Sequence, residues 1–476
     1  MPVILFLLFV AAVIWAIALA KTRVTVLEMK RMSPLHLGGV LVLLVGSVFG
    51  AEFFNISTIT LDRLLLAYLV VVAGWAWLME RENLRRPNGM DLAVVGVIGI
   101  LALSTVLHDF SYSEGLPLSR LIFFYCLPFA LYMVVRTAKL NQLDLVLITT
   151  VLGGLAVYLA LIAIAETRYF HAVIFPRFIV DSETTEFLGR GRGPFLNPVS
   201  NGLFLVAGFC SVCFWWPKSS KRVKLFVLAA AFLVAIGVYC TLTRSVWMSL
   251  FLIIGIGCWI TTNTSQKGML VVAGTIAAIV AVPVLGDKLV SFKRDKEVTI
   301  EQMSQSAQLR PLFLSVATRM FVDRPLFGCG FGQYGKEKYP YLQDAYSGQP
   351  LSKTKEYLQH NVFLAYLTET GIVGLSMLLL MLGVMARSAW LLWINRERPL
   401  EQRQFGLLLA AVLISYCVNG MFHDTSIIPM ANYLLLFVAG IVNNIRTGSP
   451  FAASELAPAT RVPTTPLPTR GYPAAN

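Results

Sequence analysis

Residues 143–165 read LDLVLITTVLGGLAVYLALIAIA, a stretch in which Asp144 is the single charged residue. A helix of this length rises roughly 35 Å, enough to cross the hydrocarbon core of a bilayer, which is about 30 Å thick. Comparable apolar runs occur near residues 3–20, 35–53, 64–79, 91–107, 119–135, 199–216, 223–240, 246–262, 268–286, 369–393, 405–420 and 427–443. The pattern predicts an all-α integral membrane protein, a polytopic bundle of about 12–13 transmembrane helices.

The composition of the 476-residue chain agrees with this prediction. Hydrophobic residues make up 57% and charged residues 14%, whereas a soluble domain carries about 25% charged residues. The net charge of +13 comes mostly from basic residues in short loops between apolar runs, so we expect a lipid bilayer and no nucleic acid as partner. Most of the seven cysteines fall in or beside apolar runs, and we predict no metal site, redox site or disulfide framework.

The loops between the apolar runs alternate in basic content. One set contains 18 lysines and arginines, and the other set, without the long loop at about 287–361, contains seven arginines. The positive-inside rule places the first set in the cytoplasm, which puts the amino terminus outside and the carboxyl terminus inside. Both long non-spanning stretches, about 166–198 and about 287–361, then lie on the outer side, the second with an amphipathic helix at 308–322.

The first apolar run has a second interpretation. Ala18-Leu19-Ala20 resembles the cleavage site of a signal peptide. However, nothing basic precedes this run, and Lys21 and Arg23 follow it directly. We therefore expect a retained helix, with cleavage as the alternative.

Arg244 is the first candidate for chemistry. It lies in Thr241-Leu-Thr-Arg-Ser245, between two apolar runs that leave almost no loop. An arginine at a helix end often extends its head group to the membrane surface without any further role. The alternative is a fixed cation at the outer face, placed to bind a phosphate.

His360 and Arg310 are the next candidates. His360 precedes the apolar stretch that begins at Asn361, where a histidine is often a capping or surface residue. Its ordinary pKa near neutrality also suits a general base for a sugar hydroxyl. Arg310 opens the amphipathic helix, and taken alone it is typical of a solvated charge at a helix end.

The predicted outer loops contain two glycine-rich stretches that could bind a ligand. Arg190 and Arg192 stand in a flexible basic segment that is suited either to an anionic ligand or to a solvated turn. Gly330-Phe-Gly-Gln-Tyr-Gly335 satisfies the GxGxxG pattern, but no predicted strand precedes it. Dinucleotide binding is therefore not predicted.

An ordered set of motifs runs through the C-terminal two-thirds of the chain: Gly193-Pro-Phe-Leu-Asn197-Pro198, Thr243-Arg244-Ser245, Arg310, Arg324-Pro-Leu-Phe-Gly328-Cys-Gly330, and His360-Asn361-Val-Phe-Leu…Glu369-Thr-Gly371-Ile-Val-Gly374. Together these motifs resemble the O-antigen ligase/polymerase superfamily of membrane glycosyltransferases. The N-terminal third is matched by hydropathy alone. The departures are Ser245 at a position that is usually glycine or small, a thirteenth span, and an acidic position displaced to Asp323.

This resemblance implies a GT-C-like helical bundle in a bacterial inner membrane. It divides the chain into amino-terminal transmembrane helices (1–165), an O-antigen ligase-like core (166–443) and a disordered cytoplasmic tail (444–476). The implied activity transfers a glycan from an undecaprenyl-diphosphate carrier to the hydroxyl of a lipid or glycan acceptor, on the periplasmic face, with inversion and without a metal or cofactor.

The resemblance also implies roles for individual residues. The catalytic residues are His360, Arg244 and Arg310, and the substrate-binding residues are Arg190, Arg192, Asn197, Asn361 and Glu369. Two guanidinium groups would neutralise the pyrophosphate leaving group, and the imidazole would accept the proton of the attacking hydroxyl.

Three functions remain as alternatives at this stage. A ligase and a polymerase differ only in the acceptor, and the His-Asn motif with its arginine spacing favours the ligase. A transporter of lipid-linked sugars would carry ionisable residues near the middle of its helices and interrupted spans in matching halves. The candidate residues lie instead at the outer rim, which favours an enzyme.

Overall fold

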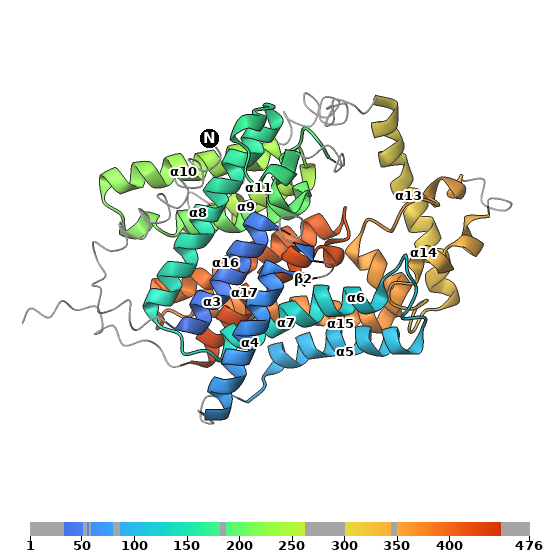
Figure 1. The fold of residues 1–476 in the computed structure, drawn as a ribbon, viewed down its shortest axis with the longest axis horizontal. Coiled ribbons are helices and arrows are strands. Elements are labelled where there is room, and N and C mark those ends of the chain that lie inside the picture. Colours follow the sequence, from blue (N-terminus) through green and yellow to red (C-terminus); the bar gives the residue numbers. More distant parts are fainter. Residues whose placement is uncertain are drawn as a thin grey trace, which may run out of the picture.

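The computed structural model describes residues 33–50, 55–56, 59–79, 86–180, 187–261, 300–343 and 350–448. Figure 1 shows a helical protein. In the described part of the chain the strands β1 (Asn55–Ile56) and β2 (Ile59–Thr60) form an antiparallel pair. The longer helices are α3 (Pro34–Phe49), α4 (Leu61–Met79), α5 (Gly89–Leu107), α7 (Leu127–Thr137), α8 (Gln142–Thr167), α9 (Pro198–Cys213), α10 (Lys221–Cys240), α11 (Arg244–Thr261), α13 (Ile300–Asp323), α15 (Val362–Ile394), α16 (Leu400–Gly420) and α17 (Pro429–Thr447).

Short helical segments connect these helices. The π-helical turn η2 joins α6 to α7, so that residues 117–137 form one continuous span. The connecting segments are α6 (Pro117–Leu121), η2 (Ile122–Cys126), η3 (His171–Val173), η4 (Arg177–Val180), η5 (Gly193–Phe195), η6 (Trp216–Lys218), α14 (Tyr334–Glu337), η7 (Tyr339–Leu342), η8 (Leu351–Thr354) and η9 (Thr425–Ile427).

The helices confirm a polytopic helical membrane protein. Within the described part of the chain, seven helical spans are long and apolar enough to cross a membrane, and α3, α9 and α11 are shorter apolar helices. Eleven of the thirteen predicted apolar runs coincide with described helices. The runs near 3–20 and 268–286, and the predicted tail beyond residue 448, lie outside the described residues. Residues 444–447, predicted as the start of the disordered tail, are instead the last turn of α17.

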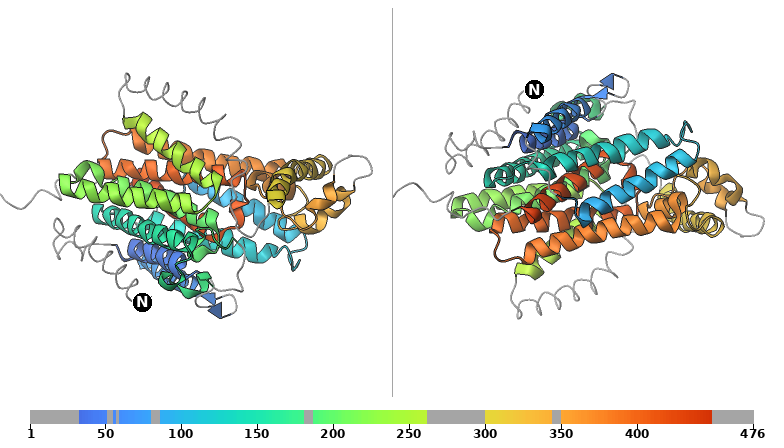
Figure 2. Two further views of the ribbon diagram at one scale, coloured as in Figure 1. Left: turned by 90° about the horizontal axis from the view of Figure 1, so that it is seen from above. Right: turned by 90° about the horizontal axis from the view of Figure 1, so that it is seen from below.

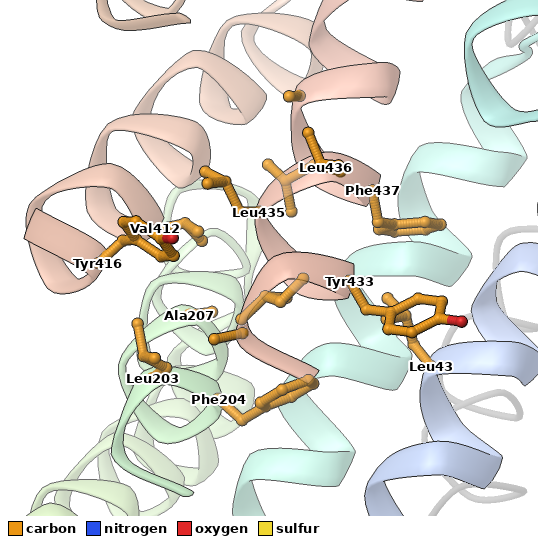
Figure 3. Close-up of a cluster of buried hydrophobic side chains, with 14 of the residues drawn as sticks. Leu43, Leu203, Phe204, Ala207, Val412, Tyr416, Tyr433, Leu435, Leu436 and Phe437 are labelled. Carbon is orange, nitrogen blue, oxygen red and sulfur yellow. The ribbon is translucent and has the colours of Figure 1, made fainter. Parts of the chain in front are cut away.

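The core is built around α17. Figure 3 shows Tyr433, Leu435, Leu436 and Phe437 of α17 between side chains of its neighbours: Leu43 of α3, Leu203, Phe204 and Ala207 of α9, and Val412 and Tyr416 of α16. Helix α17 also packs along α7, so that helices from the predicted parts 1–165 and 166–443 share one core. Burial of these apolar surfaces between helices positions the helix ends at which the candidate residues lie.

Buried polar pairs join the helix ends at the side where α15 terminates. Asp144, the single charge in the opening stretch, caps α8 through Asn141 and lies 3.4 Å from the His36 imidazole. The Arg136 guanidinium lies 2.5 Å from the Asp91 carboxylate. Each of these four side chains is almost fully buried, and each has a polar or oppositely charged partner, as buried polar groups require.

Helix α13 confirms the predicted amphipathic helix, but it begins eight residues earlier than predicted, so Arg310 lies inside the helix and not at its start. It spans Ile300–Asp323, which contains the expected 308–322 stretch, and buries one apolar face that includes Phe313, Val316 and Met320. Helices α13 and α14 lie at the end of the bundle where α15 begins (Figure 1). Figure 2 shows this segment beyond one end of the bundled helices.

Candidate functional site

Arg244 is the first residue of α11 and is half-buried. The connection from α10 consists of Thr241, Leu242 and Thr243, and Leu242 adopts a left-handed conformation with φ 49°. The Thr243 carbonyl accepts hydrogen bonds from the amides of Val246 and Trp247 in the first turn of α11. The sharp turn therefore places Arg244 at the N-terminus of α11 rather than within the apolar span.

Arg190 contacts this turn from a distant part of the chain. Its Nη2 donates to Thr243 Oγ1 at 2.6 Å, and its Nε donates to the Thr241 carbonyl at 3.3 Å. The side chain is buried, with 5% of its surface exposed. The predicted flexible basic segment is thus a packed loop at this position.

Arg192 is buried still more completely, at 1% exposure. Its Nη2 donates to the Ile179 carbonyl at 2.6 Å, and its Nε lies 3.6 Å from Glu166 Oε1. The second oxygen of Glu166 accepts the Gly193 amide at 2.8 Å. Contact of Arg192 or Arg190 with a ligand stays a prediction, because the hydrogen bonds above join both side chains to the protein.

Asn197 occupies a capping position. Its side-chain oxygen accepts the amides of Val199 and Ser200, at 2.9 and 3.2 Å, in the first turn of α9. An asparagine at this position satisfies helix amides that otherwise lack partners. The geometry gives Asn197 a structural role, and its predicted contact with substrate stays untested.

His360 lies among aromatic side chains just before α15. Its ring centroid lies 5.6 Å from that of Phe313 on α13 and 6.2 Å from that of Tyr357. Its backbone is left-handed, with φ 48°, and its side chain is exposed on the remaining side. Partial desolvation, together with the positive charge of Arg310, lowers the pKa of the His360 imidazole below its ordinary value.

Arg310 lies on α13, close enough to His360 for its positive charge to act on the imidazole. Its guanidinium carbon is 4.8 Å from the centroid of the Phe422 ring, a cation–π arrangement. Its side chain is otherwise exposed, at the end of the bundle. The structure therefore brings together two of the three predicted catalytic residues, from α13 and from the entry to α15.

Asn361 joins this pair to the end of α16. Its oxygen caps α15 by accepting the Phe363 and Leu364 amides, and its Nδ2 donates to the Met421 carbonyl at 3.1 Å. Met421 precedes Phe422, on which Arg310 rests. The His360–Asn361 corner and Arg310 thus share residues 419–423, called here the α16 terminus.

The helix that carries Arg244 reaches the same terminus. Asn419 Nδ2 donates to Ser249 Oγ at 3.2 Å, and Ser249 Oγ donates to the Ser245 carbonyl one turn back, at 2.8 Å. Helix α11 therefore begins beside the end of α16. The three residues predicted to be catalytic lie on three separate segments that all adjoin the α16 terminus.

Glu369 and the glycine motifs form a junction between two segments. Helix α15 kinks at Gly371, with φ 65° and ψ −164°, and the loop 325–332 fits against this kink. The amides of Gly330 and Gly332 donate to the carbonyl and to the carboxylate of Glu369, each at 2.9 Å. A Cβ atom at Gly371 would lie 2.3 Å from the Leu326 carbonyl oxygen. This arrangement, called the glycine junction below, buries Glu369, whose predicted contact with substrate stays untested.

The sequence alone did not single out Asp424, which follows the α16 terminus. Its Oδ1 accepts the amide and the hydroxyl of Ser426, at 3.1 and 2.5 Å. Burial raises the pKa of the Asp424 carboxyl above its ordinary value, while the bonds from Ser426 and the charge of Arg120 oppose this rise. An acidic residue directly after the apolar run 405–420 was the signal available in the sequence.

Comparison with known proteins addresses the segment that contains these residues. A family model described as O-antigen ligase matches residues 229–379. This match supports membership of the O-antigen ligase superfamily. No curated protein matches the chain. The matched segment includes Arg244, Arg310 and His360, and it ends within α15, beyond the glycine junction.

Proposed function

We propose that the protein transfers a glycan from an undecaprenyl-diphosphate carrier to an acceptor hydroxyl on the periplasmic face of a bacterial inner membrane. The family match indicates a membrane enzyme of the O-antigen ligase/polymerase type. The observation that carries the finer proposal is the meeting of Arg310 and His360 beside the α16 terminus, which α11 reaches with Arg244.

The two arginines suit the leaving group. Cleavage of a glycosyl–pyrophosphate bond leaves negative charge on the pyrophosphate oxygens. Each guanidinium presents a planar fork of donors that matches phosphate oxygens and keeps its charge at all relevant pH values. Loss of one such donor lowers the rate by a factor of about 10²–10³ in well-studied enzymes. We therefore expect Arg244→Ala and Arg310→Ala each to lower the rate of glycan transfer at least about a hundredfold.

His360 suits the acceptor. A general base has to be neutral before it accepts a proton, and the lowered pKa keeps the imidazole neutral at pH 7. In the proposed step, the acceptor hydroxyl oxygen attacks the anomeric carbon, its proton passes to His360, and the carbon–oxygen bond to the diphosphate breaks. A single displacement of this kind inverts the anomeric centre.

The proposed orientation follows from charge. The distribution of basic loops supports a cytoplasmic position for the end of the bundle that holds the buried pairs of Asp144 and Arg136. The end that holds Arg244, Arg310 and His360 then faces the periplasm, where a lipid-linked glycan presents its diphosphate at the membrane surface. Of the two acceptors left open above, we favour a lipid or protein anchor, the ligase reaction, over a second lipid-linked glycan.

The test measures release of undecaprenyl diphosphate from a lipid-linked glycan pool. Purified full-length protein is compared with His360→Ala, and with His171→Ala as a control, because His171 is an exposed histidine in the other outer loop. Membrane extract supplies acceptors. We expect release by wild type and by the control, and loss of release in His360→Ala.

The glycan products of the same reaction separate the alternatives. A single shift of an acceptor band indicates a ligase, whereas a ladder indicates a polymerase. A folded wild-type protein that releases no carrier from several donors would refute the glycosyltransferase proposal and would favour transport of lipid-linked sugars.

A further inference from the structure

The conformation of the turn before Arg244, residues 241–243, depends on contacts with a distant part of the chain. Leu242 is a non-glycine residue in the left-handed region, a conformation that persists only when its surroundings fix it. The residues on both sides of it, Thr241 and Thr243, are buried. The direction in which α11 begins, and with it the position of Arg244, therefore depends on contacts that this turn makes elsewhere.

The Gly189–Gly193 loop supplies those contacts. Arg190 donates to Thr241 and to Thr243, so that its guanidinium bridges the two ends of the turn. The next amide, that of Gly191, donates to the Cys240 carbonyl at 2.8 Å. Hydrogen bonds from an ionised donor are stronger than neutral ones, and here they act on two of the four residues before Arg244, while the neutral Gly191 amide binds a third.

The loop is itself fixed to α8. Glu166 accepts the Gly193 amide and faces Arg192. A Cβ atom at Gly191 would lie 2.6 Å from Ala163 Cβ, so the loop lies directly against that helix. Helix α8 therefore contacts the Gly189–Gly193 loop, and this loop contacts the turn before Arg244 through the hydrogen bonds of Arg190.

We propose that Arg190 is a positioning residue for Arg244, which it directs toward the diphosphate of the donor. This inference rests on the proposed function. It differs from the predicted direct contact with substrate, because the Arg190 side chain is 5% exposed and its fork bonds to the turn. A reactive group displaced by about 1 Å can cost up to about a hundredfold in rate, so modest disturbance of the turn is enough to matter.

The test is a double-mutant cycle measured as carrier release from the lipid-linked glycan pool. Arg190→Lys keeps the charge and loses the fork, and Thr243→Val removes the acceptor hydroxyl with little change of shape. Thr243→Ser keeps the hydroxyl and serves as the matched control. Arg177→Lys is a second control, because that outer-loop guanidinium also bonds to a carbonyl, that of His171.

We expect Arg190→Lys and Thr243→Val to lower the rate about tenfold and to change kcat and KM in the same pattern as Arg244→Ala. In the Arg244→Ala background neither change should lower the residual rate further, since residues that act through one group are not additive. Both controls should stay near wild type. Thermal unfolding of each variant separates this effect from a loss of folded protein.

Three results would overturn the inference. One is an equal rate loss from Arg190→Lys with and without Arg244. The second is full activity of Thr243→Val. The third is a rise in donor KM alone in Arg190→Lys, which would indicate direct binding of substrate. Full activity of Arg244→Ala would instead refute the role of Arg244 in the proposed function, and the positioning role would fall with it.

Discussion

At the scale of the residue, the proton affinity of His360 is set by its neighbours. The imidazole packs against the rings of Phe313 and Tyr357, which also contact each other, and the charge of Arg310 opposes protonation. Both effects lower the pKa of His360 relative to the ordinary value of 6.5. A base with a lowered pKa remains neutral, and so able to accept a proton, to a lower pH.

We therefore expect the pH profile of Arg310→Gln to differ from that of wild type. Removal of the cation removes one cause of the lowered pKa, so the pKa of His360 rises and the acid limb of kcat/KM moves to higher pH. The measurement is the residual rate of carrier release between pH 5 and pH 8, and Arg319→Gln on the same helix is the control. An unmoved acid limb would show that His360 is not the titrating base.

At the scale of the element, the glycine junction explains why two motifs far apart in sequence occur together. The Ile372 amide of α15 donates to the Pro325 carbonyl at 2.8 Å, and the Cys329 amide of the loop donates to the Thr368 carbonyl at 2.9 Å. A helix kink frees backbone groups that need partners. The loop supplies these partners, and Gly371 provides the left-handed conformation at the kink.

Gly371→Ala should destabilise the protein. The new methyl group would meet the Leu326 carbonyl, and alanine would also adopt a strained φ of 65°. Such strain costs about 1–3 kcal/mol, so we expect a lower midpoint of thermal unfolding in detergent. Gly383→Ala on the same helix has open space and should be neutral or stabilising by about 0.5–1 kcal/mol. Equal midpoints for the two variants would contradict this account.

The elements themselves were largely predictable, whereas the contacts between their ends were not. Apolar runs long enough to span a bilayer predicted the helices, and the spacing at 308–322 predicted α13, because both depend on local periodicity. The hydrogen bonds from Asn361 to Met421 and from Arg190 to Thr241 join residues that are far apart in sequence. No local pattern encodes such contacts, so a basic stretch was interpreted as flexible when its arginines are packed.

At the scale of the whole molecule, the charge pattern separates two ends of the bundle. Arg136 and Arg403 lie near the end of α15, where Arg403 donates to the Trp393 carbonyl. Arg310 and His360 lie at the other end, where α15 begins. The orientation proposed for the membrane depends on this separation.

Reporter fusions after Lys224 and after Gly335 test that orientation. Lys224 lies near the start of α10, on the side proposed as cytoplasmic, and Gly335 lies in α14, on the side proposed as periplasmic. We expect a phosphatase reporter, which is active only outside the cytoplasm, to be active at the second position alone. Activity at both positions, or at neither, would refute the assignment of sides.

The glycine junction also limits how this protein can be recombined with its relatives. The loop 325–332 and the kink at Gly371 are complementary halves of one surface, with backbone groups of each half bonded to the other. A chimaera that exchanges the outer segment around α13 and α14 would separate these halves unless the first turns of α15 were exchanged with it. The two segments would then have to be exchanged as a pair, and grafts that keep this pairing would be the ones that remain folded.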